Sequence, residues 1–168
     1  MAEARVFVYC PMCGTKLEST ERHGAIRPVC PDCDYTVYYD PKVAVIMLVT
    51  RGDRVLLVQR GVDPEKGKWA LPAGFVNAGE VPAEAAAREI TEETGLTVGN
   101  VRLIDVFPNP GDGTADILIA YAADITGGEM AADDDAVDVG LFNDDDMPPT
   151  AFKTTEWLLE RWRHGDVE

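Results

Sequence analysis

Short apolar segments separated by polar turns characterise the chain from residue 43 onward. The segment VAVIMLVT at 43–50 is rich in β-branched residues. It is far shorter than the ~20 residues that span a bilayer, so it predicts a buried strand. A turn at RGDR leads to a second strand over 54–60, and a glycine-containing loop over 61–68 precedes an extended piece from Trp69 to Pro72. Further strands are predicted near 101–107, 115–124 and 137–142.

Two segments have helical patterns. Between Pro82 and Gly95 the chain is rich in alanine; proline suits a first helical turn, and glycine can adopt the left-handed conformation that ends a helix. Residues 151–163 carry apolar side chains at helical intervals, which predicts a helix packed on a core. The stretch GGEMAADDDAVD is expected to be a mobile loop. Strands interleaved with helices predict an α/β or α+β domain.

Four cysteines lie within the first 33 residues, as CPMC at 10–13 and CPDC at 30–33, with 16 residues between the pairs. This spacing is typical of zinc sites. A pair of disulfides or unrelated buried thiols are the alternatives, but the N-terminus has no secretory signal that would favour disulfides. Four sulfur ligands leave no open position, so the zinc would be structural. We expect a zinc ribbon over residues 1–38 and a larger domain over 39–168, with Zn²⁺ bound by Cys10, Cys13, Cys30 and Cys33.

The formal net charge is −15, from 30 acidic and 15 basic residues. Such a surface repels a phosphate backbone, which makes nucleic acid an unfavourable partner. No apolar run is long enough for a membrane span, and the missing signal peptide predicts a cytoplasmic protein. The acidity has two interpretations that both stay open: an ordinary solvated surface, or adaptation to a high-salt, halophilic cytoplasm.

Three glutamates, Glu89, Glu92 and Glu93, fall within about one turn of the first predicted helix, where like charges repel one another. The face is either solvated or in contact with cations. The preceding LPAGFVNAGE supplies Gly74, whose carbonyl oxygen can reach an ion because glycine lets the backbone approach closely. Carboxylates and carbonyls are the ligands that Mg²⁺ prefers while it bridges to phosphates. The same helix also carries Arg88, eight residues after Glu80, so a salt bridge can tie the loop to the helix.

The spacing of these residues resembles the Nudix box at every defined position over residues 74–96: Gly74, Glu80, Arg88, Glu89, Ile90, Glu92, Glu93, Gly95 and Leu96. The resemblance implies a Nudix-type α/β/α sandwich with a mixed sheet. It also implies an enzyme that hydrolyses nucleoside diphosphates linked to another moiety with Mg²⁺ or Mn²⁺. By the same resemblance, Glu89 and Glu93 are the principal metal ligands and Glu92 is a ligand or orients water. Glu80 and Arg88 are then structural partners.

The N-terminal ribbon, together with YYDPKVAV and LFNDDDMPPTAF, resembles the zinc-ribbon-containing branch of that family. This branch includes FAD and ADP-ribose pyrophosphatases, which implies one of these substrates and AMP as a product. NADH pyrophosphatases carry SQPWPFP after the box, whereas this chain reads VFPNPGDGTADIL. The alternatives are an NADH, NAD-cap or other housecleaning pyrophosphatase, and a non-catalytic nucleotide-binding regulator. The ribbon is expected to shape the substrate entrance or to form a homodimer contact.

Several further residues are candidates for substrate contact or for an additional acid. Arg60 ends the second strand and can meet a phosphate, with a structural ion pair as the alternative. Phe107 is a candidate for stacking on a base, whereas Trp69 is better explained by core packing. The segment FPNPGDG at 107–113 is either a substrate-shaping loop or a plain hairpin turn. Members of the family use a late acid as base or ligand, and the candidates here, in what is otherwise a solvated loop, are Asp133, Asp134, Asp135 and Asp138.

Overall fold

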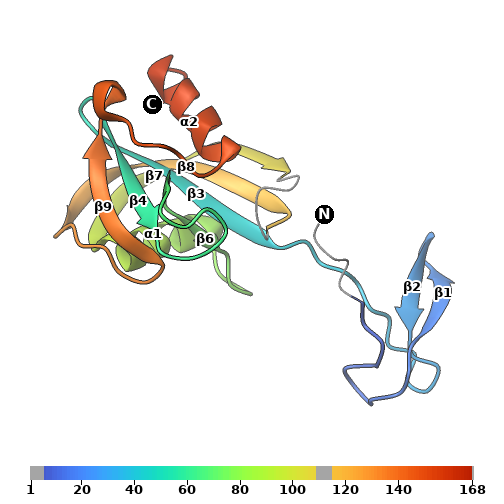
Figure 1. Cartoon of the computed structure of the whole chain (residues 1–168). Helices are drawn as coiled ribbons and strands as arrows, with labels where there is room; N and C mark the ends of the chain where they lie inside the picture. The colour runs from blue at the N-terminus through green and yellow to red at the C-terminus, as the bar shows by residue number, and fades with distance from the viewer. Residues whose placement is uncertain (1–5, 109–114, 168) are drawn as a thin grey trace. The chain divides into compact units, whose positions relative to one another are not determined.

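The structure is a computed structural model that describes residues 6–108 and 115–167. The chain divides into two compact units, Met1–Pro41 (unit 1) and Lys42–Glu168 (unit 2) (Figure 1). Within the described ranges, no helix is both long enough and apolar enough to cross a membrane.

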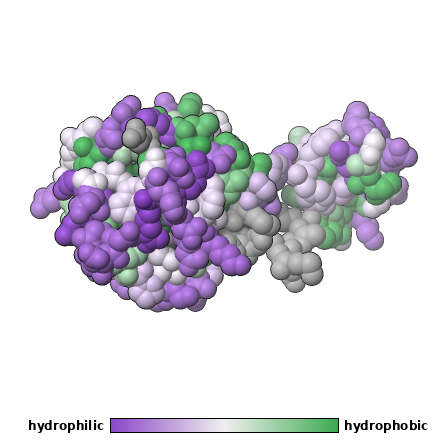
Figure 2. Space-filling view, turned by 90° about the horizontal axis from the view of Figure 1, so that it is seen from above, coloured by the Kyte–Doolittle hydropathy of each residue, from purple (hydrophilic) through white to green (hydrophobic). Residues whose placement is uncertain are grey.

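In unit 1, β1 (Glu18–Arg22) and β2 (Ala25–Val29) form an antiparallel hairpin. Each cysteine pair closes a tight turn: the amide of Gly14 donates to the carbonyl of Cys10 at 2.9 Å, and that of Asp34 donates to Cys30 at 3.0 Å. The described part of unit 1, residues 6–41, buries few apolar side chains, and Figure 2 shows hydrophobic residues on its visible surface.

In the described part of unit 2, seven strands form a mixed sheet. They are β3 (Val43–Arg51), β4 (Arg54–Arg60), β5 (Trp69–Ala70), β6 (Ala73–Phe75), β7 (Leu96–Pro108), β8 (Ile117–Gly128) and β9 (Ala136–Phe142). The main path runs β5-β4-β3-β8-β7, with β6 paired to β3 and β9 paired to β4. Only β3 and β8 pair in parallel among these strands, and the other pairs are antiparallel.

Two helices cover opposite faces of this sheet: α1 (Pro82–Thr94) and α2 (Lys153–Arg163) (Figure 1). The alternation of side chains along β3 explains the arrangement. Odd-numbered residues such as Met47 pack with Ile90 of α1, and even-numbered residues such as Ile46 pack with Leu158 of α2. Both faces are buried, which is why the sequence of β3 is continuously apolar. The predicted α/β/α sandwich with a mixed sheet is confirmed.

Some boundaries differ from the sequence expectations. Strand β7 begins at Leu96 instead of near 101, and β8 extends to Gly128. The first part of β7 contains Gly99 and Asn100, which are poor strand formers, and its pairing with β8 is interrupted by register shifts after Thr97, Gly99 and Leu103. The short strand β6 lies in a segment expected to be a loop, because glycine is a poor strand former. Helix α2 begins at Lys153, two residues later than expected.

Candidate functional site

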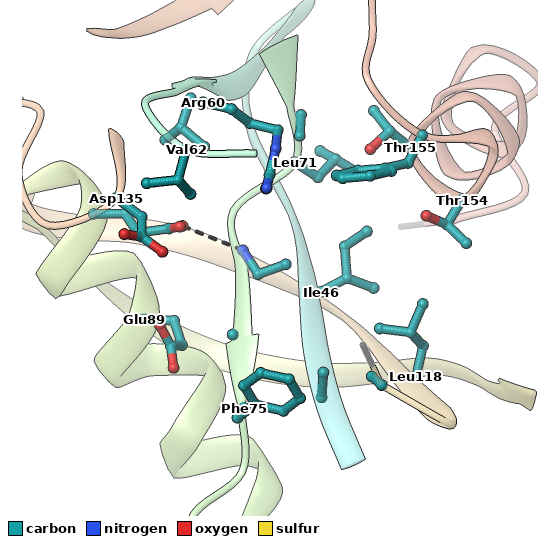
Figure 3. A pocket seen from close by; sticks show the side chains of 18 of the residues that line it. Ile46, Arg60, Val62, Leu71, Phe75, Glu89, Leu118, Asp135, Thr154 and Thr155 are labelled. Atoms are coloured by element: carbon teal, nitrogen blue, oxygen red, sulfur yellow. Dashed lines mark hydrogen bonds between the residues drawn. The ribbon is translucent and has the colours of Figure 1, made fainter. Parts of the chain in front are cut away.

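A pocket of about 450 Å³ lies in unit 2, where α1, the sheet and the start of α2 meet. In Figure 3, Glu89 and Asp135 lie on one side of the pocket, and Thr154 and Thr155 lie on the other. The wall between them contains aliphatic side chains of the sheet, including Ile46 and Leu118. The pocket is therefore acidic at one end and largely apolar along its walls.

The acidic end is built around two buried glutamates of α1. Glu89 and Glu93 are each only 8% exposed, and their i, i+4 spacing places both on the side of the helix that faces β6. Gly74 of β6 lies directly against Glu89: a Cβ atom at position 74 would sit 1.9 Å from the carboxyl carbon of Glu89. Any other residue at 74 would displace this carboxylate, so the glycine is required by close packing.

The surroundings of these two carboxyl groups disfavour their ionised forms. Burial, followed by repulsion from Glu89, raises the pKa of Glu93 to about 8, although the amide of Ala73 donates to Glu93 Oε2 at 3.2 Å. Burial is also the largest cause of the raised pKa of Glu89. Asp134 adds repulsion to both groups, and it lines the same pocket. The site thus concentrates negative charge that a cation can compensate.

Arg88 ties the preceding loop to α1. Its Nε donates to Glu80 Oε1 at 2.7 Å and one Nη donates to Glu80 Oε2 at 3.0 Å, a bidentate pair. The same guanidinium donates to the carbonyl of Phe75 at 3.0 Å. The Arg88 hydrogen bond, aided by the amide of Asn77, lowers the pKa of Glu80 to about 2. This pair fixes the loop that carries Gly74 onto the helix that carries Glu89.

Glu92 has a different environment from its two neighbours. Glu89 Oε1 and Glu92 Oε2 both accept from Arg88 Nη1, at 2.8 and 2.7 Å, but the Glu92 side chain is 45% exposed. It does not line the pocket, whereas Glu89 and Glu93 do. The structure therefore brings two of the three predicted glutamates together at the pocket, and the third, Glu92, is not among the lining residues.

The late acidic segment also divides into two groups. Asp134 and Asp135 line the pocket, whereas Asp133 and Asp138 do not. The carbonyl of Asp135 accepts from the amide of Gly61 at 2.8 Å, and the amide of Asp133 donates to the carbonyl of Glu93 at 3.3 Å. These backbone bonds hold the segment against both α1 and the loop after β4. Sequence spacing alone does not indicate which of the four carboxylates faces inward.

The chain was compared with models of known protein families. The model of the family described as "NUDIX domain" matches residues 40–161. The chain belongs to the Nudix family. The Nudix fold and a Nudix enzyme, both predicted from the box residues, are thereby confirmed.

Several relatives of this Nudix chain are described by function. An ADP-ribose pyrophosphatase from Methanocaldococcus jannaschii is 37% identical over 135 residues, covering 78% of this chain and 80% of the relative. An NAD-capped RNA hydrolase NudC from Pseudomonas aeruginosa is 32% identical over 144 residues, covering 84% of this chain but only 49% of that protein. A crystal structure of a NUDIX hydrolase from Nitrosomonas europaea superimposes with a TM-score of 0.85 at 28% identity, covering 96% of this chain and 94% of that chain.

The remaining candidates for substrate contact lie at different positions in unit 2. Arg60 lines the pocket, where its guanidinium stacks on Phe152 at 4.8 Å and its Nε donates to the carbonyl of Pro64 at 2.8 Å. Phe107 instead packs edge-on against Trp157 at 5.1 Å and does not line the pocket. Trp69 packs against Phe142 at 4.7 Å in the core. Residues 109–114, which include most of the predicted FPNPGDG loop, lie outside the described residues.

Sequence reasoning missed the pocket residues at the start of α2. Phe152, Thr154 and Thr155 line the pocket. From the sequence, the apolar side chains of this segment were expected only to pack in the core. Two adjacent threonines at the start of an amphipathic helix can indicate a ligand-binding position, because the backbone amides of the first turn have no partner within the helix. That signal is weak without knowing which end of the helix faces a cavity.

In unit 1 the four cysteine sulfurs converge. Their Sγ atoms all lie within 4.8 Å of one another. Individual Sγ–Sγ separations are 3.6 Å for Cys10 and Cys33, 3.4 Å for Cys13 and Cys30, and 3.6 Å for Cys13 and Cys33. A tetrahedral ion with Zn–S bonds of about 2.3 Å requires sulfurs about 3.8 Å apart. The arrangement fits a four-sulfur zinc site.

Proposed function

We propose that this Nudix enzyme hydrolyses the pyrophosphate bond of ADP-ribose, releasing AMP and ribose 5-phosphate. The observation that carries the proposal is the buried pair Glu89 and Glu93, facing Gly74 at the acidic end of a pocket with room for a nucleotide. The substrate is supported by the M. jannaschii pyrophosphatase, which is similar over most of both chains. FAD, the other substrate suggested by the sequence, is the competing member of the same class.

The donor set fits Mg²⁺ or Mn²⁺. Two buried carboxylates and the carbonyl oxygen of Gly74 are hard oxygen ligands. Burial and then repulsion from Glu89 raise the pKa of Glu93, and a divalent cation offsets both by stabilising the ionised carboxylate. Glu89 and Glu92 each have one carboxylate oxygen on Arg88 Nη1, so each has its second oxygen for a cation. When bound, such ions neutralise the phosphoryl oxygens and activate water.

The protein's own groups have three further roles in the proposal. The Glu80–Arg88 pair holds the loop so that Gly74 stays against α1. Asp134 and Asp135 are the acids placed to accept a proton from the attacking water, since both line the pocket near Glu93. The aliphatic wall excludes solvent from the bound nucleotide, which strengthens the electrostatic interactions at the acidic end.

The test is hydrolysis by the purified full chain with Mg²⁺ or Mn²⁺. The panel contains ADP-ribose, FAD, NADH, NAD-capped RNA and a nucleoside triphosphate, with products separated by chromatography and salt varied. We expect ADP-ribose to give the highest kcat/KM and AMP to be a product. No cleavage of any member, with divalent metal shown to bind, would favour a non-catalytic nucleotide-binding regulator.

A second candidate function is hydrolysis of NAD-capped RNA or NADH, because NudC proteins are among the similar relatives. The chain spans about half the length of the P. aeruginosa protein, and its net charge of −15 disfavours RNA. A kcat/KM for NAD-capped RNA above that for ADP-ribose would establish this alternative.

For unit 1 we propose a structural zinc ribbon, supported by the convergence of its four sulfurs. The ribbon carries several exposed apolar side chains, including Val6, Met12 and Ile26. They are consistent with the homodimer contact or substrate entrance suggested above. Removing unit 1 and measuring the molecular mass and kcat/KM of the remainder tests both roles.

A further inference from the structure

The two pocket-lining acids Asp134 and Asp135 lie in a tight turn with an unusual backbone. The amide of Ala136 donates to the carbonyl of Asp133 at 3.0 Å, which closes the turn. Within it, Asp134 has a φ of 52°, a left-handed conformation that is uncommon for residues with a side chain. Such a conformation persists where the surrounding structure holds it. The contacts on both sides of this turn therefore decide where its two carboxylates lie.

The chain that leads into the turn is bonded to the carboxyl end of α1. The amide of Ala131 donates to the carbonyl of Thr94 at 2.9 Å, and the amide of Asp133 donates to that of Glu93 at 3.3 Å. The last carbonyls of a helix have no partner within the helix, so they are available for such bonds. This contact ties the turn to the helix that carries Glu89 and Glu93.

The chain that leaves the turn rests on Gly61, the first residue after β4. The amide of Gly61 donates to the carbonyl of Asp135 at 2.8 Å. The contact leaves no room for a side chain, because a Cβ atom at position 61 would lie 2.9 Å from that carbonyl oxygen and 2.8 Å from Cγ1 of Val137. Gly61 is not among the described glycines with a left-handed backbone. Close packing, and not backbone freedom, is thus the reason for glycine at this position.

The pairing of β4 with β9 also changes at this point. Gln59 pairs with Asp138 and Arg60 pairs with Ala136, so Val137 is an extra residue in β9. Bulges of this kind bend a strand and redirect its end, and they are frequent next to active sites. The bulge and the Gly61 contact together set the direction in which the chain enters the turn.

Between these two attachments, the carboxylates of the turn act on the acidic end of the pocket. Asp134 repels both Glu89 and Glu93, and Asp135 repels Glu93. Figure 3 shows Asp135 on the same side of the pocket as Val62, the residue after Gly61. Because electrostatic interactions weaken with distance, a displacement of the turn would change the charge at the acidic end.

We infer that Gly61 is a positioning residue, which holds the turn of Asp134 and Asp135 at the acidic end of the pocket by its amide and by its lack of a side chain. Gly61 itself does not line the pocket, although Arg60 and Val62 do, so it acts through the two acids. The inference rests on the proposed function, in which these acids accept a proton from the attacking water.

The kinetic experiment uses Gly61→Ala, which adds the methyl group that the contact excludes. We expect kcat for ADP-ribose to fall about tenfold to hundredfold, with KM changed less than about twofold, because the acids move while the remaining pocket walls stay in place. Lys66→Ala, an exposed residue of the same loop that does not line the pocket, is the control and should keep full activity.

A second genetic background separates positioning from a general structural defect. In a protein that carries Asp134→Asn and Asp135→Asn, Gly61→Ala should lower kcat no further, because the groups through which Gly61 acts are already removed. A merely structural defect would lower kcat by the same factor in both backgrounds. That result, or unchanged kcat in Gly61→Ala alone, would overturn the inference.

Hydrogen exchange tests the same contact without any measurement of activity. In the unmodified protein, the amide of Gly61 should be protected by its bond to Asp135. In Gly61→Ala, the amides of Asp133 and Ala136 should exchange at least about tenfold faster, while those of β3 stay slow. An unprotected Gly61 amide in the unmodified protein, or unchanged exchange at Asp133 and Ala136 in the variant, would refute the positioning role. Faster exchange at these amides in a protein that hydrolyses no substrate would support the positioning and contradict only the proposed function.

Discussion

At the scale of single residues, the pocket depends on a close contact between a backbone and a carboxylate. Gly74 leaves room for Glu89, and the amide of the preceding residue donates to Glu93. Both carboxylates are held out of bulk water, which makes them unfavourable as isolated anions and good ligands for a cation. The identity of one small residue therefore determines where two charged groups lie.

Glu93→Gln tests the role of the more strongly perturbed carboxylate. We expect kcat for ADP-ribose to fall about 10²- to 10⁴-fold, because the amide cannot hold a divalent cation or a proton as the carboxylate does. The metal-free variant should be folded, since it removes a buried charge. Glu84→Gln, an exposed position on the same helix, is the control and should keep full activity. Near-normal turnover by Glu93→Gln would contradict the assignment.

Gly74→Ala tests the packing of β6 against α1. The added methyl group would overlap the Glu89 carboxylate, so we expect a loss of about 1–3 kcal/mol in the free energy of unfolding. The double variant Gly74→Ala, Glu89→Ala should recover much of that loss relative to Glu89→Ala alone, because the clash is with this side chain. Denaturant unfolding of the four proteins measures the coupling. Additive losses would show that the glycine is required for another reason.

At the scale of elements, the loop before α1 is attached to the helix by one charge pair. Glu80 accepts two hydrogen bonds from Arg88 and one from the amide of Asn77 at 2.8 Å. These bonds favour the ionised carboxylate, so the pKa of Glu80 is lower in the folded state than in the unfolded chain. The pair thus stabilises the folded state only at pH values at which Glu80 is ionised in that state.

This attachment predicts a pH dependence. A folded-state pKa of about 2, against 4.5 for the free group, gives a stabilisation that is fully present above about pH 4.5 and is lost as the pH falls through about 2. Glu80→Gln should therefore be less stable than the unmodified protein at pH 7, and the difference should shrink between pH 4.5 and 2. Denaturant unfolding at several pH values measures this. A difference that does not depend on pH would mean that Glu80 acts by shape and not by charge.

Sequence patterns predicted the elements whose packing is regular and missed those fixed by tertiary contacts. The buried strand β3 and helix α1 were predictable because apolar periodicity and cap residues mark them locally. β6 was not, since its pairing with β3 depends on partners far along the chain. In the site, the box spacing identified Glu89 and Glu93. The separate position of Glu92 and the pocket-lining role of Thr155 depend on which way each side chain faces, and spacing does not encode this.

At the scale of the whole molecule, unit 1 has little apolar core of its own. Among residues 6–41, the buried hydrophobic side chains are Val29, Val37 and two of the four cysteines. So small a core rarely stabilises a fold without a metal or another covalent or ionic link. Unit 2, by contrast, buries both faces of a seven-stranded sheet.

Removal of zinc should therefore affect the two units differently. We expect one zinc ion per chain, and a strong chelator should unfold unit 1 while unit 2 stays folded. In a two-dimensional amide spectrum, the resonances of residues 6–41 should collapse and those of β3 and α1 should remain. A chelated protein with an unchanged spectrum would refute a structural metal in unit 1.

The excess of acidic residues predicts a dependence on salt. In Figure 2 hydrophilic residues cover most of the visible face of unit 2, and the net charge of the chain is −15. Mutual repulsion of such charges destabilises a compact state, and salt screens it. We expect the melting temperature to rise between 0.1 M and 2 M KCl if the chain is adapted to high salt. A melting temperature that is already maximal at 0.1 M would leave an ordinary solvated surface as the explanation.

The parallel pairing of β3 with β8 has a consequence for how the protein is made. The ribosome releases β3 (Val43–Arg51) long before β8 (Ile117–Gly128), yet β8 is the neighbour of β3 on one side of the sheet. Until that point in synthesis, an apolar strand has an open edge, which is an aggregation hazard. Pairing across so many intervening residues is also intrinsically slow. Nascent chains of this protein are thus expected to depend on chaperones until most of the sequence has emerged, and chains truncated before residue 117 are expected to aggregate.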